Sequence, residues 1–160
     1  MNLLRIDDCG LRIADLNRFN GMSPEEFKKR TKAYALRIIH LVEALPRNET
    51  CRVLGRQLLR AGTSVGANYR AACRAKSRPD FITKMDIVEE EGDEGLYWME
   101  LLIESGQVKA SRLASLMKER DAILALTVAS INTARWKLDD LPARKRPSKS
   151  AIRNPQSAME

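Results

Sequence analysis

Apolar side chains recur at alternating steps of three and four residues in four successive segments of this chain. Such spacing places them on one face of an α-helix, so the fold has to bury four amphipathic helices. The first segment opens with a capping box, in which Ser23 is the N-cap, Pro24 the first helical residue and Glu26 the third. Pro46 stops the pattern, which predicts a helix over residues 24–45. Its apolar face comprises Phe27, Thr31, Tyr34, Ile38, Leu41 and Leu45.

Three further segments carry the same pattern. A second helix is predicted after Asn48-Glu49 and fades near Ala75; its apolar face comprises Cys51, Leu54, Leu58, Ala61, Val65, Asn68 and Ala72. Ser77 is placed to cap a third helix and Gly106 to end it, with Phe81, Met85, Val88, Gly92, Gly95, Met99 and Leu102 between them. A fourth helix starts near Ser111 and uses Leu113, Met117, Leu124, Thr127, Ile131 and Ala134.

Helices of similar length joined by short connections pack as antiparallel neighbours, which predicts an all-α, up-down-up-down four-helix bundle over residues 23–137. Aromatic residues make up only 5% of the chain and apolar residues 44%, which is typical of a helical protein. Residues 1–22 form an extension for which no structure is predicted. Residues 138–160 are polar and basic, and we expect a disordered tail.

The charges of the second and third predicted helices are opposed. Residues 47–78 hold eight basic side chains and one acidic, a net of +7, whereas residues 79–105 hold one basic and nine acidic, a net of −8. Six arginines of the first stretch fall on one helical stripe, almost opposite the apolar face: Arg52, Arg56, Arg60, Arg70, Arg74 and Arg78. A stripe about 39 Å long suits a phosphate backbone. It also suits a solvated face, or a partner for the acidic helix of the same or another subunit.

Glycines interrupt these two helices, and four of them, Gly62, Gly66, Gly92 and Gly95, call for a compensating reason because each costs about 1 kcal/mol relative to alanine. If the second and third helices fold back about Ser77, Gly62 lies near the level of Gly92. Gly66 and Gly95 complete the two pairs. We expect the missing side chains to allow close approach of the two backbones.

The same folding back brings polar residues to matching levels: Ser64 near Glu91, Arg60 near Glu94, and Asn68 near Asp86. Two interpretations remain open for the cluster formed by Ser64, Asn68, Glu91 and Glu94. It is either a polar group that fixes helix register, within the bundle or between subunits, or a ligand or catalytic site.

Catalysis has little support in the sequence. His40 is the only histidine, so a carboxylate-bridged di-metal site lacks its ligands, and no cofactor is predicted. The cysteines Cys9, Cys51 and Cys73 lie far apart without a C-x-x-C pair.

We find no membrane span and no export signal, and we expect a cytoplasmic protein. A second apolar stripe, formed by Ile87, Trp98 and Leu101 with Leu116, Ile123 and Leu126, predicts self-association.

The sequence resembles the bacterial four-helix bundle proteins related to the 23S rRNA intervening-sequence protein. The likeness extends over residues 23–135 and is carried by Ala61-Gly-Thr-Ser-Val-Gly-Ala-Asn-Tyr-Arg70, Ala75-Lys-Ser77, Asp80-Phe81, Ile87, Glu91, Glu94 and Tyr97-Trp98-Met-Glu-Leu-Leu102. Ala71 departs from the acidic residue often found after the position of Arg70. The resemblance implies a ring-like homo-oligomer, typically a pentamer. Related accessory variability proteins of diversity-generating retroelements are basic, bind nucleic acid and partner a reverse transcriptase.

Taken together, these features predict a non-enzymatic, homo-oligomeric bundle that binds RNA or other nucleic acid through the six arginines. The alternative is a structural or protein-binding scaffold without affinity for nucleic acid.

Overall fold

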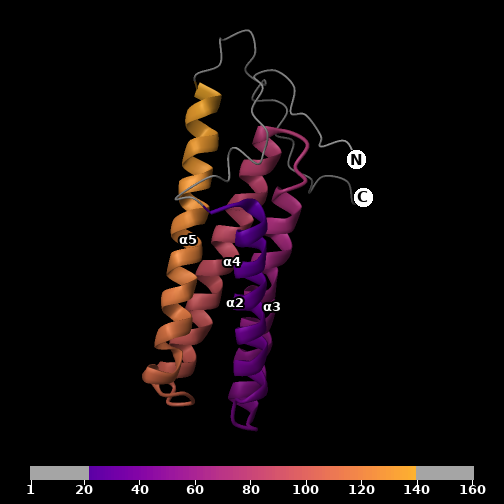
Figure 1. Ribbon diagram of the computed structural model, residues 1–160. Helices are drawn as coiled ribbons and strands as arrows, with labels where there is room; N and C mark the ends of the chain where they lie inside the picture. Colours follow the sequence, from indigo (N-terminus) through magenta and orange to yellow (C-terminus); the bar gives the residue numbers. More distant parts are fainter. Residues whose placement is uncertain (1–21, 140–160) are drawn as a thin grey trace, which may run out of the picture.

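The computed structural model describes residues 22–139, which form four helices: α2 (Pro24–Glu43), α3 (Glu49–Ala72), α4 (Arg78–Glu104) and α5 (Ala110–Asp139). Successive helices run in opposite directions and lie side by side in a single bundle (Figure 1). The predicted all-α antiparallel four-helix bundle is therefore confirmed. Residues 1–21 and 140–160, which hold nearly all of the predicted extension and tail, lie outside the described residues.

The first helix begins where the capping box predicts. The Glu26 amide donates to Ser23 Oγ at 3.2 Å, and the Ser23 amide donates to Glu26 Oε2 at 2.7 Å. The helix ends at Glu43, two residues earlier than predicted. Pro46 explains the difference, because its ring disfavours the helical conformation of the residue before it.

The turn between α3 and α4 also comes early, since α3 ends at Ala72 rather than near Ala75. Ser77 then adopts an extended conformation (φ −151°, ψ 168°) and its side chain accepts a hydrogen bond from the Asp80 amide, which confirms it as an N-cap. At the other end of α4, Gly106 has φ +73°, a left-handed conformation that glycine adopts without strain. Both predicted ends of α4 are thus confirmed.

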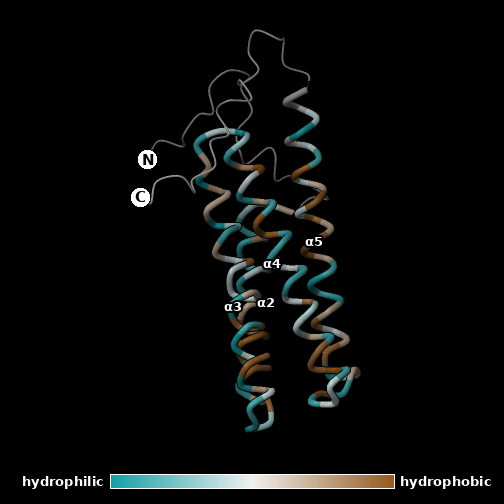
Figure 2. Tube along the Cα trace, turned by 180° about the vertical axis from the view of Figure 1, so that it is seen from behind, coloured by the Kyte–Doolittle hydropathy of each residue, from teal (hydrophilic) through white to brown (hydrophobic). Residues whose placement is uncertain are grey.

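The bundle core consists largely of the predicted apolar faces, and the differences include which residues of α3 are buried. All seven predicted face residues of α4 are buried. On α3, Leu54 and Asn68 are only partly buried, whereas Tyr69 and Gly62 are fully enclosed, so the helix is rotated slightly from its predicted orientation. Hydrophilic and hydrophobic residues alternate along every helix, as amphipathic helices require (Figure 2).

Leu116 and Ile123 belong to the core rather than to an outer apolar stripe. Their exposed fractions are 4% and 1%, so the prediction that they broaden an external surface is wrong. The physical reason is that α5 contacts both α4 and α2. A helix with two neighbours buries a face wider than a single line of residues. The contact between α3 and α4 is the most extensive in the bundle, and that between α2 and α5 is much smaller.

Within residues 22–139, no helix has the combination of length and apolar character needed to cross a bilayer.

Candidate nucleic-acid interface

The structure places four of the six predicted arginines on α3 and separates the other two from it. Arg52, Arg56, Arg60 and Arg70 are exposed along α3, and Arg74 is exposed in the turn that follows.

Arg78 is the exception, because it is the first residue of α4 and is only 5% exposed. Its assignment to an outward stripe is therefore wrong. The helical wheel requires α3 to continue past Ala72. Because the chain turns there instead, the phase relation between Arg78 and the other arginines is lost.

Two of the exposed arginines are engaged by carboxylates. Arg52 pairs with Glu49 on its own helix, with Nη2 2.5 Å from Oε1. Arg60 reaches across to α4, where it contacts both carboxylate oxygens of Glu91 at 3.2–3.3 Å and forms a second ion pair with Glu94. Among the described residues, no ion pair or hydrogen bond involves the side chains of the remaining three arginines: Arg56, Arg70 and Arg74. Their charge is open to solvent.

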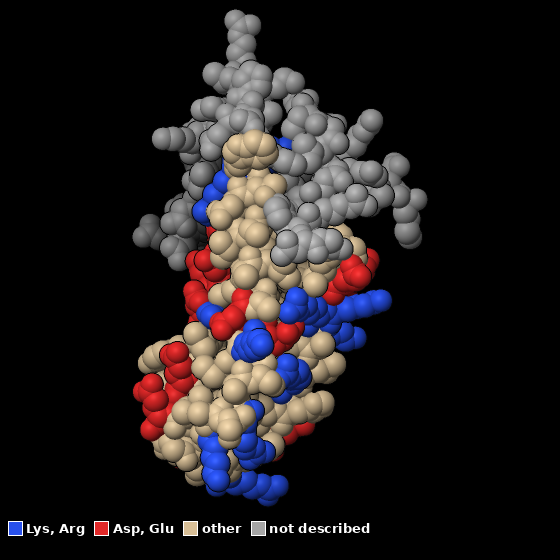
Figure 3. Space-filling model, turned by 60° about the vertical axis from the view of Figure 1, so that its left-hand side comes forward, with Lys and Arg blue, Asp and Glu red and all other residues tan. Residues whose placement is uncertain are grey.

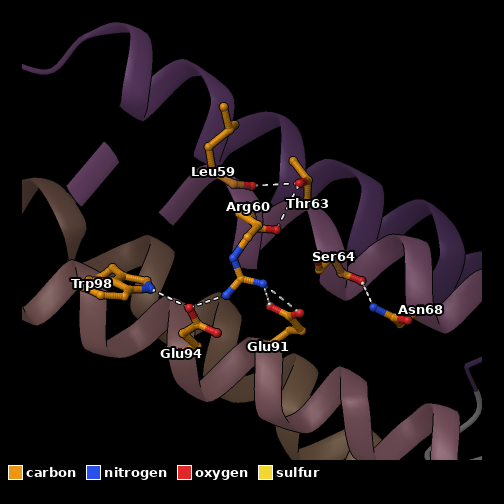
Figure 4. A network of polar contacts seen from close by, with 8 residues as sticks. All are labelled: Leu59, Arg60, Thr63, Ser64, Asn68, Glu91, Glu94 and Trp98. Atoms are coloured by element: carbon orange, nitrogen blue, oxygen red, sulfur yellow. Dashed lines mark hydrogen bonds and ion pairs between the residues drawn. The ribbon is translucent and has the colours of Figure 1, made fainter. Parts of the chain in front are cut away.

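The predicted polar cluster divides into two groups (Figure 4). Glu91 and Glu94 face Arg60, and Trp98 Nε1 donates to Glu94 Oε1 at 3.0 Å. The hydrogen bond from Arg60, followed by that from Trp98, lowers the pKa of Glu94. This group is an ion-pair clasp that joins α3 to α4.

Ser64 and Asn68 form the second group and stay on their own helix. Asn68 Nδ2 donates to the Ser64 backbone oxygen at 3.0 Å. Within the described chain, no hydrogen bond joins Asn68 to Asp86, whose partner is Arg135 at 3.0 Å. The sequence predicted only that Asn68 and Asp86 lie at the same level of the two helices, which requires no hydrogen bond between them. A one-turn bond to the helix backbone satisfies the amide locally.

The glycines of α3 and α4 leave room for residues of α2 and α5 and do not face one another. A Cβ on Gly62 would lie 2.7 Å from Ile38 Cγ1 of α2, and one on Gly92 would overlap Leu124 Cδ1 of α5. Gly66 faces the Thr31 backbone oxygen of α2, at 3.5 Å from a Cβ. The expectation that Gly62 and Gly92 bring α3 and α4 together is wrong, because these glycines lie on the faces of α3 and α4 that meet α2 and α5.

A buried arginine on α5 was not identified from the sequence. Arg120 is 7% exposed; its Nε donates to the Gly92 carbonyl oxygen at 3.0 Å, and its guanidinium pairs with Asp93 and Asp121. The sequence held a signal for it, since the apolar pattern steps by seven residues from Met117 to Leu124 and Arg120 occupies the face position between them. The polar atoms of a buried arginine need partners, and here they connect α4 to α5.

The residues considered for metal binding or redox chemistry do not come together. His40 is exposed on α2, and Cys51 and Cys73 are free thiols. Over the described ranges, no three His, Cys, Asp or Glu side chains are grouped to hold a metal ion.

The two signs of charge are unevenly distributed over the surface of the bundle. Seen from the side of α5, most acidic side chains lie to the left and most basic side chains to the right and at the lower end, with some of each sign on the other side (Figure 3). The acidic set includes Glu90, Asp93, Glu100 and Glu104, which are exposed on α4.

Comparison with known proteins identifies similar chains. The model of a family described as 23S rRNA-intervening sequence protein matches residues 25–129. The chain is also similar to the 1.70 Å crystal structure of a protein of unknown function from the S23 ribosomal protein family of Bacteroides thetaiotaomicron VPI-5482. The sequences are 35% identical, the similarity covers 68% of this chain and 97% of that chain, and the TM-score is 0.64. No curated protein matches the chain.

Proposed function

The chain belongs to the 23S rRNA-intervening sequence protein family, and from this premise we propose that it is a non-enzymatic bundle that binds RNA or other nucleic acid through α3. The observation that carries the proposal is that Arg56 and Arg70 on α3 and Arg74 in the turn after it are exposed, and that no ion pair within residues 22–139 engages their side chains. We call these three residues the open arginines.

An arginine paired with a carboxylate attracts a phosphate less strongly, because the pair carries no net charge and some of its N–H donors are occupied. This separates the open arginines from Arg52 and Arg60. Each guanidinium offers a planar fork of donors that fits two phosphate oxygens. The formal net charge of +7 favours approach of a polyanion.

The test is the salt dependence of binding. We expect the purified full chain to bind a 20-base-pair DNA duplex and a structured RNA, with affinity falling steeply between 50 and 200 mM KCl. Replacing the open arginines in Arg56→Ala, Arg70→Ala and Arg74→Ala together should reduce the slope of log K against log salt by up to about 2.7 for duplex DNA, because each phosphate contact contributes about 0.9. Fluorescence anisotropy gives both slopes.

The matched control removes the same number of positive charges elsewhere. Lys109, Arg112 and Lys118 are exposed at or near the start of α5. Changing all three to Ala should leave most of the slope intact. An equal loss in both triple variants would mean that net charge alone drives binding, and no binding at low salt would reject the proposal.

We further propose that copies of the chain associate as a homo-oligomer, with the pentamer of related bundles as the expected form. Four large apolar side chains support it by their exposure to solvent: Leu36, Val53, Tyr97 and Trp136, at 45–63%. Light scattering should give a multiple of 18.1 kDa. A reverse transcriptase as protein partner rests on the resemblance alone and stays an expectation.

A scaffold without nucleic-acid affinity is the second candidate. One observation favours it: Arg60 of α3 already pairs with two carboxylates of α4 within the chain. Within residues 22–139, no ion pair engages Glu90, Glu100 or Glu104, so the same pairing is open to a neighbouring copy. Under this candidate, loss of the open arginines breaks the oligomer, and no nucleic acid binds at any salt concentration.

A further inference from the structure

An open pocket of about 660 Å³ lies at the turn between α2 and α3. Most of its exposed lining surface is apolar, with Val42, Leu45, Pro46 and Leu59 as the apolar wall, and polar and charged side chains complete the lining. Binding sites for small molecules and cofactors commonly fall in this range of volume and are mostly apolar, with a few polar groups.

The pocket is a consequence of how α2 ends. Pro46 stops the helix, and Leu45 and Val42 fold against α3 at Gly55, where a Cβ would lie 3.0 Å from Leu45 Cδ1 and 3.3 Å from Val42 Cγ1. Val42, Leu45 and Leu59 are only partly buried, so they present apolar surface to the outside while they pack on the core.

Three arginines surround this apolar wall: Arg47, Arg52 and Arg56. Arg52 is held by Glu49, whereas no ion pair among the described residues engages Arg47 or Arg56. Arg56 is also one of the open arginines. The pocket therefore lies at one end of the surface to which nucleic acid is assigned above.

We propose that this pocket receives one unpaired nucleotide of the bound nucleic acid, with its base against Leu45, Pro46 and Leu59 and its flanking phosphates on Arg47 and Arg56. The inference rests on the proposed function. The occupant follows from the chemistry of the pocket. The apolar wall fits a planar base, and the two arginines, which form no ion pair within the described chain, fit the phosphates joined to that base. Glu43, exposed at the pocket edge, offers a carboxylate to an exocyclic amino group.

The test compares two RNA duplexes of 20 base pairs that differ only by one bulged adenine. We expect the full chain to bind the bulged duplex about tenfold more tightly, because the unstacked base leaves water for the apolar wall of the pocket. Replacing the bulged adenine with 2-aminopurine provides a second readout, since its emission should change when the base enters the pocket.

Two tryptophan variants separate the pocket from the arginine surface. Leu45→Trp fills the pocket and should abolish both the tenfold preference and the emission change, while affinity for the fully paired duplex stays unchanged. Ala125→Trp adds the same ring at an exposed position of α5 outside the pocket, and should keep both. Leu59→Trp fills the pocket from the opposite wall and replaces Leu45→Trp if circular dichroism shows that variant to be unfolded.

Equal affinity of the wild type for both duplexes overturns the pocket inference and leaves the proposed function intact. The same holds if the pocket-filling variant keeps the preference, or if filling the pocket changes only the oligomeric state, which would assign the pocket to a protein side chain. Absence of binding to either duplex overturns the proposed function as well.

Discussion

Single residues in this bundle show how strongly position changes the role of one amino acid. Gly62 and Gly66 lie one turn apart on α3, but only Gly62 is enclosed by side-chain atoms of Ile38, which would lie 2.7–3.2 Å from a Cβ at that position. Ile38 is fully buried and branched at Cβ, so it has little freedom to move away.

We expect Gly62→Ala to lower the free energy of unfolding by about 1–3 kcal/mol, because overpacking exceeds the gain in helix propensity. Gly66→Ala is the matched control. Its Cβ would make ordinary contact at 3.5 Å, so the variant should be neutral or more stable by up to about 1 kcal/mol. Urea unfolding monitored by circular dichroism measures both, and equal effects would contradict the packing argument.

Tyr34 makes the stability of the protein sensitive to high pH. Its hydroxyl is buried without a hydrogen-bond partner among the described residues, and burial raises its pKa from 10.0 to about 12. The folded chain therefore keeps a proton that the unfolded chain releases above pH 10, so stability falls as the pH rises from 10 to 12.

Between pH 9 and pH 11, wild type should lose about 1.4 kcal/mol more stability than Tyr34→Phe, which has no hydroxyl to titrate. Tyr34→Phe should also be at least as stable as wild type at pH 9, since it removes an unpaired polar group. Urea titrations at both pH values test this. Identical losses in the two proteins would show that burial does not raise the pKa of Tyr34.

At the scale of the helices, capping side chains fix where α2, α3 and α4 begin. The ion-pair clasp fixes how α3 pairs with α4. The capping residues Ser23, Asn48 and Ser77 each accept a backbone hydrogen bond three residues ahead. The clasp of Arg60 with Glu91 and Glu94 is exposed on the Arg60 side, so it sets register more than stability.

Ser77→Ala should destabilise the protein by about 1 kcal/mol, because the Asp80 amide loses its acceptor at the start of α4. Thr83→Ala is a suitable control, as its exposed hydroxyl bonds only to the Pro79 carbonyl of the same helix. We expect that change to be within about 0.5 kcal/mol of wild type by chemical unfolding. A larger effect at residue 83 than at residue 77 would argue against the cap.

At the scale of the whole molecule, α3 and α4 present opposite charges to solvent. Exposed arginines lie along α3, and exposed carboxylates lie along α4. A polyanion bound to α3 is repelled by α4, whereas a neighbouring copy would be attracted to it.

Changing Glu90, Glu100 and Glu104 together to Gln raises the formal net charge from +7 to +10. If α3 binds nucleic acid, affinity should rise at 50 mM KCl and the increase should fade at 200 mM, where screening is stronger. Anisotropy at the two salt concentrations tests this, and light scattering on the same samples reports the oligomeric state. A smaller assembly with no gain in affinity would favour the scaffold.

Much of the fold was predictable because its signals are local. The three- and four-residue spacing, the capping box at Ser23, the cap at Ser77 and the left-handed Gly106 each act within one or two turns of chain. These signals define four helices and their order, and short connections leave antiparallel packing as the simple solution. The sequence also determined the charge contrast between α3 and α4.

The tertiary structure decided which side of each helix meets which neighbour. A rotation of α3 by part of a turn moved Asn68 outward and Tyr69 inward, and the early end at Ala72 enclosed Arg78. Gly62 accommodates Ile38, and Arg120 is buried between α4 and α5. Such outcomes depend on the shapes of side chains that are distant in sequence, because close packing selects one fit among many that the helical pattern allows equally.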